Sequence, residues 1–174
     1  MATFTVTTVA DTVDAGDGVL SLREAVQQAN ANAAKDTILF APALEGQTLT
    51  LSRGELAITQ DVALDGDRNG DGTRVTLDGD DRFCVLLVAG NCGGGVDLET
   101  TDLDIVDGGF EDMFNFTFGS GITLLEGNTL TLRNCTVTSC STYAAGGGLD
   151  LRAGTTTTII DSSIVGNLSA AYGE

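Results

Sequence analysis

The sequence predicts an all-β fold, a parallel β-helix (β-solenoid) whose N-terminal end carries a cap with one short amphipathic α-helix. The first observation is a repeat: Gly121-Ile122-Thr123-Leu124 matches Gly148-Leu149-Asp150-Leu151, 27 residues later. A fixed period of this size indicates stacked units that each bury an apolar face on a neighbour. The second observation is that apolar and polar residues alternate within each unit, which is the two-residue period of a half-buried strand. We therefore expect the last two turns, or rungs, at 121–147 and 148–174.

The composition limits the classes of partner. The chain has 174 residues and a net charge of -17, from 25 acidic and 8 basic residues, with no His. Binding to nucleic acid through phosphates needs a basic surface, so no nucleic-acid partner is expected. No apolar run is long enough to predict membrane insertion. The lack of His removes the commonest general base, whereas the excess of carboxylates favours binding of cations.

Residues 1–47 form the predicted N-terminal cap. Ser21 and Glu24 have the spacing of a capping box, in which each side chain accepts a hydrogen bond from the backbone amide of the other residue. Apolar residues then recur at helical spacing and predict a helix over about 21–33, with a buried face made of Leu22, Ala25, Val26, Ala29 and Ala33. Alternating residues predict strands at 3–9 and 37–40. A helix laid over the first rung would close strand edges that otherwise invite aggregation.

The segment Ser21-Leu22-Arg23-Glu24-Ala25, with Gly16-Asp17-Gly18 before it and Gln28-Ala29-Asn30-Ala31 after it, resembles a known motif. It is similar to the "CSLREA" motif that opens many secreted bacterial right-handed parallel β-helix proteins, often large surface proteins or adhesins. Leu20 stands where that family has its leading Cys. The resemblance implies a right-handed solenoid and an extracellular or cell-surface location, and it is silent about activity.

Residues 48–174 form the predicted rungs. Alternating or apolar stretches predict strands at 49–51, 55–58, 62–64, 75–77, 83–88 and 96–106, ahead of the two repeats. The stretch 108–116 interrupts this rhythm with Phe and Met residues, which we expect to cover an edge of the core. Asn134 and Asp161 occupy equivalent positions of the two repeats, so side chains stacked there are expected to hydrogen-bond along the solenoid axis.

Residues 65–78 carry the sharpest chemical signal. From Asp67 onward the sequence follows the pattern D-x-N-x-D-G, then five residues and an acid, which is the pattern of a calcium-binding loop. Alternate oxygens of such a loop converge on one Ca²⁺, and Gly72 permits the sharp turn. The alternative is a solvated acidic turn. The predicted calcium ligands are Asp67, Asn69, Asp71, Thr73 and Asp78, with Asp65 as a substitute for Asp78.

The four cysteines leave two alternatives open. Their even number and close spacing allow bridges Cys84–Cys92 and Cys135–Cys140 in an oxidising compartment. The other interpretation is that they are buried small apolar residues.

Three classes of function remain on these grounds. The first is a calcium-stabilised structural or adhesive extracellular module, whose partner is a further copy of itself or a cell-surface or glycan partner. The second is a polysaccharide-active enzyme, either a pectate-lyase-like lyase or a glycosidase, because parallel β-helices host such chemistry. The third is a calcium-dependent glycan-binding module. We expect the first, a non-enzymatic role, because a chain of net charge -17 repels an acidic polysaccharide.

Overall fold

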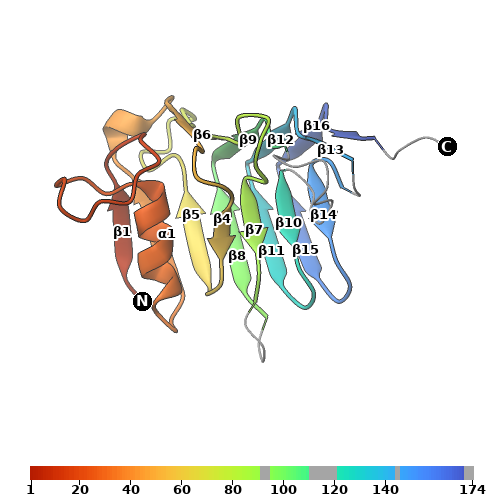
Figure 1. The fold of residues 1–174 in the computed structure, drawn as a ribbon, viewed down its shortest axis with the longest axis horizontal. Coiled ribbons are helices and arrows are strands. Elements are labelled where there is room, and N and C mark those ends of the chain that lie inside the picture. The colour runs from red at the N-terminus through yellow and green to blue at the C-terminus, as the bar shows by residue number, and fades with distance from the viewer. Residues whose placement is uncertain (91–94, 110–120, 144–145, 171–174) are drawn as a thin grey trace.

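The chain folds into a parallel β-solenoid of about four turns with one α-helix at its N-terminal end (Figure 1). The structure is a computed structural model, and it describes residues 1–90, 95–109, 121–143 and 146–170. The all-β parallel fold with a helical cap is thereby confirmed.

Four parallel sheets run along the solenoid, and each rung adds one strand to a sheet. Sheet A has the order β1 (Thr3–Val6), β2 (Asp36–Phe40), β5 (Val62–Asp65), β8 (Asp97–Thr101), β11 (Thr129–Arg133) and β15 (Thr156–Ile160). Sheet B has the order β3 (Thr48–Thr50), β6 (Val75–Asp78), β9 (Leu103–Val106), β12 (Thr136–Thr138) and β16 (Ser163–Val165). Sheet C has the order β4 (Leu56–Ile58), β7 (Leu86–Val88), β10 (Ile122–Leu124) and β14 (Leu149–Leu151), and sheet D pairs β13 (Ser141–Thr142) with β17 (Leu168–Ser169).

The register of the last two rungs follows the 27-residue repeat in every sheet. Ile122 aligns with Leu149, Leu132 with Ile159, Val137 with Ile164 and Ser141 with Leu168. The repeat predicted from the sequence is therefore the repeat of the structure. Earlier rungs differ in length: Asp36 aligns with Val62, 26 positions later, and Val62 aligns with Leu98, 36 positions later.

The core consists of ladders of inward-facing aliphatic side chains from sheets A, B and C. In sheet B, Leu49, Leu77, Ile105 and Val137 align from strand to strand, and all four are buried. Full burial of such a side chain stabilises the fold by about 1.5–3 kcal/mol. These ladders explain how a chain with so few aromatic residues builds a core.

The predicted strand at 96–106 is wrong in one respect, because the structure divides it at Asp102 into β8 and β9. Asp102 has a φ of 53°, and the equivalent residues Asn134 and Asp161 have a φ of 50°. Asn and Asp tolerate this left-handed conformation better than most residues do. Each residue turns the chain from sheet A to sheet B, and the Asn134 side-chain amide donates to Asp102 Oδ1. The expected hydrogen bonding along the axis is thus found between these two residues.

Helix α1 (Leu22–Asn30) closes one end of the stack, against β1, β2 and β4 (Figure 1). The predicted capping box is confirmed: Ser21 Oγ accepts from the Glu24 amide at 3.1 Å, and Glu24 Oε2 accepts from the Ser21 amide at 2.9 Å. The apolar face is buried at Leu22, Ala25, Val26 and Ala29. Ala33 lies beyond the helix and is exposed, so the predicted face was one residue too long.

The cysteines that the structure describes form no disulfide: Cys84, Cys135 and Cys140 are free. Burial raises the pKa of Cys84 to about 12 and that of Cys140 to about 11. Both thiols are therefore protonated and unreactive at neutral pH. Cys92 and the Phe- and Met-containing stretch 110–116 lie outside the described residues.

Candidate metal centre

The loop between β5 and β6 brings two carboxylates, those of Asp67 and Asp71, together with the Glu45 carboxylate of the preceding rung. One side-chain oxygen from each of Glu45, Asp67 and Asp71 lies within 4.8 Å of the other two. Oxygens bound to one Ca²⁺ at 2.3–2.6 Å can be at most about 5 Å apart. The spacing therefore suits a shared calcium ion. It is the one such group of acidic, Cys or His ligand atoms in the described part of the chain.

Asp67 organises the loop from a buried position. Its Oδ1 accepts from the Gly70 amide at 2.8 Å, and its Oδ2 accepts from the Gly72 amide at 2.6 Å. Asp71 accepts from the Thr73 amide at 2.8 Å, and the Thr73 side chain and amide hold the pKa of Asp71 below its usual value. The Asp67 and Asp71 carboxylates thus hold the backbone of the loop, an arrangement common to calcium loops and to acidic turns without an ion.

Glu45 is the ligand that the sequence pattern did not identify. It follows the 3-10 helix η1 (Pro42–Leu44), and the Gly46 amide holds this segment to the Arg74 carbonyl at 3.0 Å. Glu45 Oε2 accepts from Asn69 Nδ2 at 2.5 Å, whereas Oε1 is buried without a hydrogen-bond partner. A buried carboxylate oxygen without a partner is costly, and a cation would satisfy it.

The remaining predicted ligands lie around this group. Asn69 contacts it through Glu45, and exposed Thr73 contacts it through Asp71. Asp65 accepts from the Asp67 amide at 3.2 Å. Burial raises the pKa of Asp65; the Asp67 amide opposes this rise, and the charges of Asp102 and Asp67 add to it.

Asp78 lies at the C-terminal end of β6, away from the start of that strand where the loop ends. It accepts from the Asp80 amide at 2.7 Å and from Thr50 Oγ1 at 3.1 Å. Neither Asp65 nor Asp78 supplies an oxygen to the group of three carboxylates.

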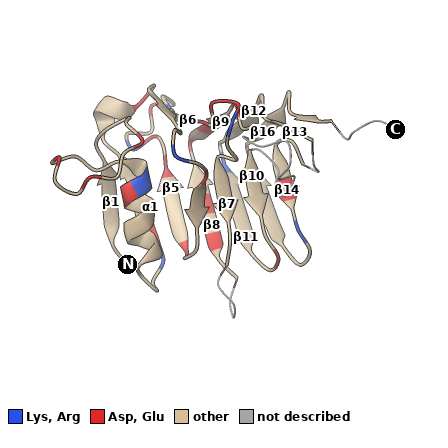
Figure 2. Cartoon of the chain, in the orientation of Figure 1, with Lys and Arg blue, Asp and Glu red and all other residues tan. Residues whose placement is uncertain are grey.

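The donor set fits Ca²⁺ chemically. All three charged donors are carboxylates, and hard cations prefer such oxygens over nitrogen or sulfur. Glu45, Asp67 and Asp71 would hold the ion, which would offset two of the three negative charges and join two successive rungs. Figure 2 shows that acidic residues are spread over the cap, the loops and several strands of the chain.

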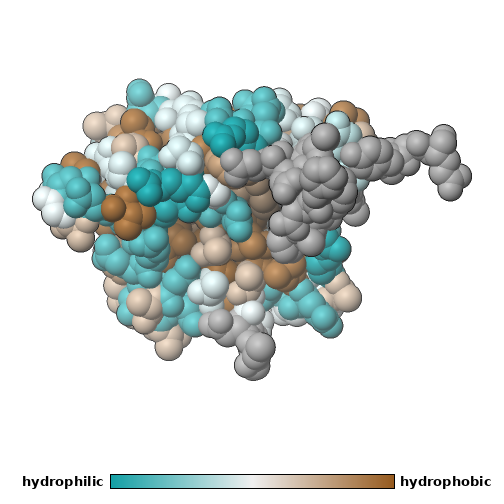
Figure 3. All heavy atoms as spheres, viewed as in Figure 1, coloured by the Kyte–Doolittle hydropathy of each residue, from teal (hydrophilic) through white to brown (hydrophobic). Residues whose placement is uncertain are grey.

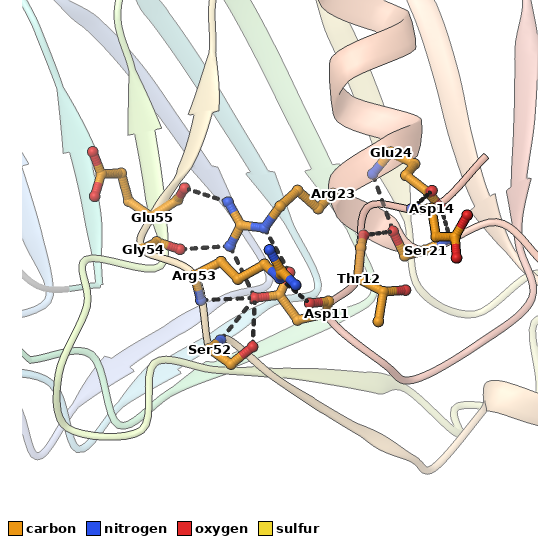
Figure 4. Close-up of polar contacts among 10 residues, drawn as sticks. All are labelled: Asp11, Thr12, Asp14, Ser21, Arg23, Glu24, Ser52, Arg53, Gly54 and Glu55. Atoms are coloured by element: carbon orange, nitrogen blue, oxygen red, sulfur yellow. Dashed lines mark hydrogen bonds and ion pairs between the residues drawn. The ribbon is translucent and has the colours of Figure 1, made fainter. Parts of the chain in front are cut away.

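A second polar cluster fastens the cap to the first rung (Figure 4). Arg23 donates to Asp11 through Nε at 2.6 Å and through Nη2 at 3.0 Å, and both side chains are largely buried. Arg23 also donates to the carbonyls of Gly54 at 2.6 Å and Glu55 at 3.1 Å. Asp11 in turn accepts from the Ser52 amide at 2.7 Å. These contacts join the helix and the loop before it to the turn at 52–55.

Ser21 and Glu24 extend this cluster into the loop that precedes the helix. Ser21 Oγ donates to the Thr12 carbonyl at 2.7 Å, and Glu24 Oε1 accepts from the Asp14 amide at 2.7 Å. The charged and hydroxyl side chains of the segment Ser21-Leu22-Arg23-Glu24-Ala25 therefore all hold the cap in place, and its apolar residues face the core.

Comparison with known proteins finds no family model, no curated protein and no solved structure that matches the chain. Of the helices described, none has the length and apolar character needed to cross a membrane.

Proposed function

We propose that the chain is a calcium-stabilised structural module of an extracellular β-solenoid protein, acting through self-association or through contact with a cell-surface or glycan partner. The observation that carries the proposal is the convergence of Glu45, Asp67 and Asp71, with a buried carboxylate oxygen left without a partner. An ion at this point would tie η1 to the β5–β6 loop. It would fix the register of two rungs and would perform no chemistry.

The contacts of two of the three neighbouring arginines also support a structural role, whereas the third, Arg68, is exposed. Arg74 donates to Asp104 Oδ1 at 3.2 Å and to the Asn134 side chain. Arg82 lies 3.7 Å from an Asp80 oxygen and stacks over Phe83. A lyase acting on an acidic sugar needs a basic group that is free to take a proton. These two guanidiniums are used instead to bind carboxylates of the fold.

The proposal is tested by thermal unfolding of the full chain with Ca²⁺ and with EDTA. Calcium that binds only the folded chain raises the unfolding midpoint by mass action. Asp71→Asn should abolish most of this shift, whereas the exposed Asp17→Asn should leave it intact. Equal midpoints in Ca²⁺ and EDTA would contradict the calcium part of the proposal.

Catalysis is tested separately. The same protein is incubated with acidic and neutral polysaccharides, and new reducing ends and unsaturated products are measured. We expect neither to form. Calcium-dependent product formation would replace the structural proposal with the enzymatic one, and calcium-dependent glycan binding without products would favour the glycan-binding module.

A further inference from the structure

Asn69 is the one asparagine in the sequence that a glycine follows. The Asn69–Gly70 pair lies in the loop between β5 and β6, where residues 68–73 are all exposed. Because glycine has no Cβ, its backbone can approach a neighbouring group closely. Gly70 has a φ of 72°, and among the described residues only its chain neighbours come within 4 Å of the place a Cβ would take. The Gly70 nitrogen therefore has room to close a succinimide ring on the Asn69 side-chain carbon Cγ.

Hydrogen bonds hold the reacting groups of this pair. The Gly70 amide donates to Asp67 Oδ1 at 2.8 Å. Asn69 Oδ1 accepts from the Asp71 amide at 2.8 Å, and Asn69 Nδ2 donates to Glu45 Oε2 at 2.5 Å. A base within hydrogen-bond reach of a proton promotes its transfer, and an N–H aimed at an oxygen that becomes negative stabilises the new charge. The loop thus places a proton acceptor at the nucleophile and a donor at the developing oxyanion.

We propose that the loop converts its own Asn69 to an acid by deamidation. The Gly70 nitrogen gives its proton to Asp67 and forms a bond to Asn69 Cγ, while the carbonyl electron pair moves to Oδ1, where the Asp71 amide stabilises it. The bond from Cγ to Nδ2 then breaks, and that nitrogen leaves as ammonia with the proton that came from Gly70. Water opens the succinimide to aspartate or isoaspartate, so the reaction consumes one water and releases one ammonia. Water has access, since the loop is exposed and hydrophilic residues cover much of the cap and the adjoining loops (Figure 3).

The product places a further carboxylate beside the group formed by Glu45, Asp67 and Asp71. It replaces the amide that now donates to Glu45 Oε2, so a hydrogen bond becomes a contact between like charges. Such charges repel, and the converted loop is less stable without a cation. Calcium affinity rises with the number of charged ligands. The calcium affinity of the loop should therefore increase as the protein ages, and this consequence, unlike the reaction itself, rests on the proposed function.

The cap loop offers a matched control site. Asp17→Asn creates another Asn–Gly pair at an exposed position. Asp17 Oδ1 accepts from the Val19 amide at 3.0 Å, as Asn69 Oδ1 does from the amide two residues after it, and Gly18 has a φ of 78°. No carboxylate of the described residues accepts from the Gly18 amide. Position 17 therefore shares the turn of the Asn69 site and lacks its proton acceptor.

The test is peptide mapping by mass spectrometry after folded Asp17→Asn is incubated at neutral pH with EDTA. Trypsin cleaves after Arg23, Arg68 and Arg74, so the peptides 1–23 and 69–74 carry the two sites separately, each with a single asparagine. We expect Asn69 to convert about tenfold faster or more than position 17, because a positioned base contributes at least this factor. In urea, where neither turn persists, the two sites should convert at similar rates. Absence of conversion at Asn69, or conversion no faster than at position 17 in the folded chain, would overturn the proposal.

Calcium provides a second measurement on the wild type that needs no substitution. Ca²⁺ should slow the conversion of Asn69, because the ion would occupy the Asp67 carboxylate that takes the proton. Asn69→Asp, which has the sequence of one product, should bind Ca²⁺ about tenfold more tightly than the wild type in titration calorimetry. Conversion of Asn69 at equal rates in Ca²⁺ and EDTA, with no binding of Ca²⁺, would leave the deamidation standing and contradict the calcium site. A chain that never converts, but whose unfolding midpoint still rises with Ca²⁺, would overturn the deamidation and leave the proposed function standing.

Discussion

Arg23 and Asp11 form a two-point ion pair in which Nε donates to Oδ1 at 2.6 Å and Nη2 donates to Oδ2 at 3.0 Å. The exposed fractions of the two side chains are 12% and 6%. The pair lies where the cap meets the turn after β3, and each partner also binds backbone groups of that turn. One ion pair therefore links the helix, the loop before it and the first rung.

Removing Arg23 is expected to destabilise the fold strongly. Arg23→Met leaves the Asp11 carboxylate buried without its cation, and loss of one partner of a buried pair costs about 3–5 kcal/mol. Arg133→Met removes the exposed pair with Glu99, at 3.2 Å, and should cost about 1 kcal/mol or less. Urea unfolding of both variants measures the difference. Equal losses of unfolding free energy would show that the cap contributes no more than a surface contact.

Acid should unfold the cap because Asp11 must remain charged. Burial alone would raise the pKa of Asp11, but the hydrogen bond from Arg23, the Ser52 amide, the Arg23 charge and the Arg53 amide together lower it. Since the pKa is lower in the folded chain, this stabilisation is complete above the unfolded value of about 3.9 and is lost as the pH falls through the folded value.

Urea midpoints measured from neutral pH into this acid range test the expectation. The wild type should lose stability steeply at the acid end. Asp11→Asn should be less stable at neutral pH and should show a shallower dependence on pH. A variant curve parallel to that of the wild type would mean that Asp11 does not contribute to acid unfolding.

Leu132 and Ile159 lie at aligned positions of the neighbouring strands β11 and β15. Leu132 is fully buried, whereas Ile159 is 46% exposed. Leu132→Ala should cost about 2–5 kcal/mol, because it opens a cavity in a fully buried ladder. Ile159→Ala should cost far less, since 46% of Ile159 is already exposed. Thermal unfolding of the two variants compares the losses. Similar losses for both would indicate that Ile159 is covered in solution.

The sequence was sufficient to predict the solenoid because its last two rungs have equal length. Leu132 and Ile159 are 27 residues apart in the sequence and are neighbours in sheet A. The turn at Asp102 was missed because Val96 to Val106 was interpreted as one alternating strand. The buried positions in fact change from even numbers (Leu98, Thr100) to odd numbers (Leu103, Ile105) across Asp102. The capping box was predictable because both of its residues lie within one helical turn.

The candidate site was predictable only within its loop. Asp67 and Asp71 follow a local pattern, whereas Glu45 reaches them from the preceding rung. Only the pairing of β3 with β6 places Glu45 beside the loop. Thr48 pairs with Thr76, 28 positions later, and the same offset aligns Glu45 with Thr73. This offset of 28 differs from the 27-residue repeat at the end of the chain, so that repeat could not predict the position of Glu45.

The most direct test of the calcium-stabilised module is titration calorimetry with Ca²⁺ on the wild type, Glu45→Gln and Asp78→Asn. We expect one site among the described residues of each wild-type chain. Glu45→Gln should weaken binding about tenfold or more, because it removes one of three charged ligands. Asp78→Asn should bind as the wild type does, since Asp78 lies outside the group of three carboxylates. Absence of calcium binding by the wild type, or loss of binding in Asp78→Asn with Glu45→Gln unaffected, would contradict the proposed site.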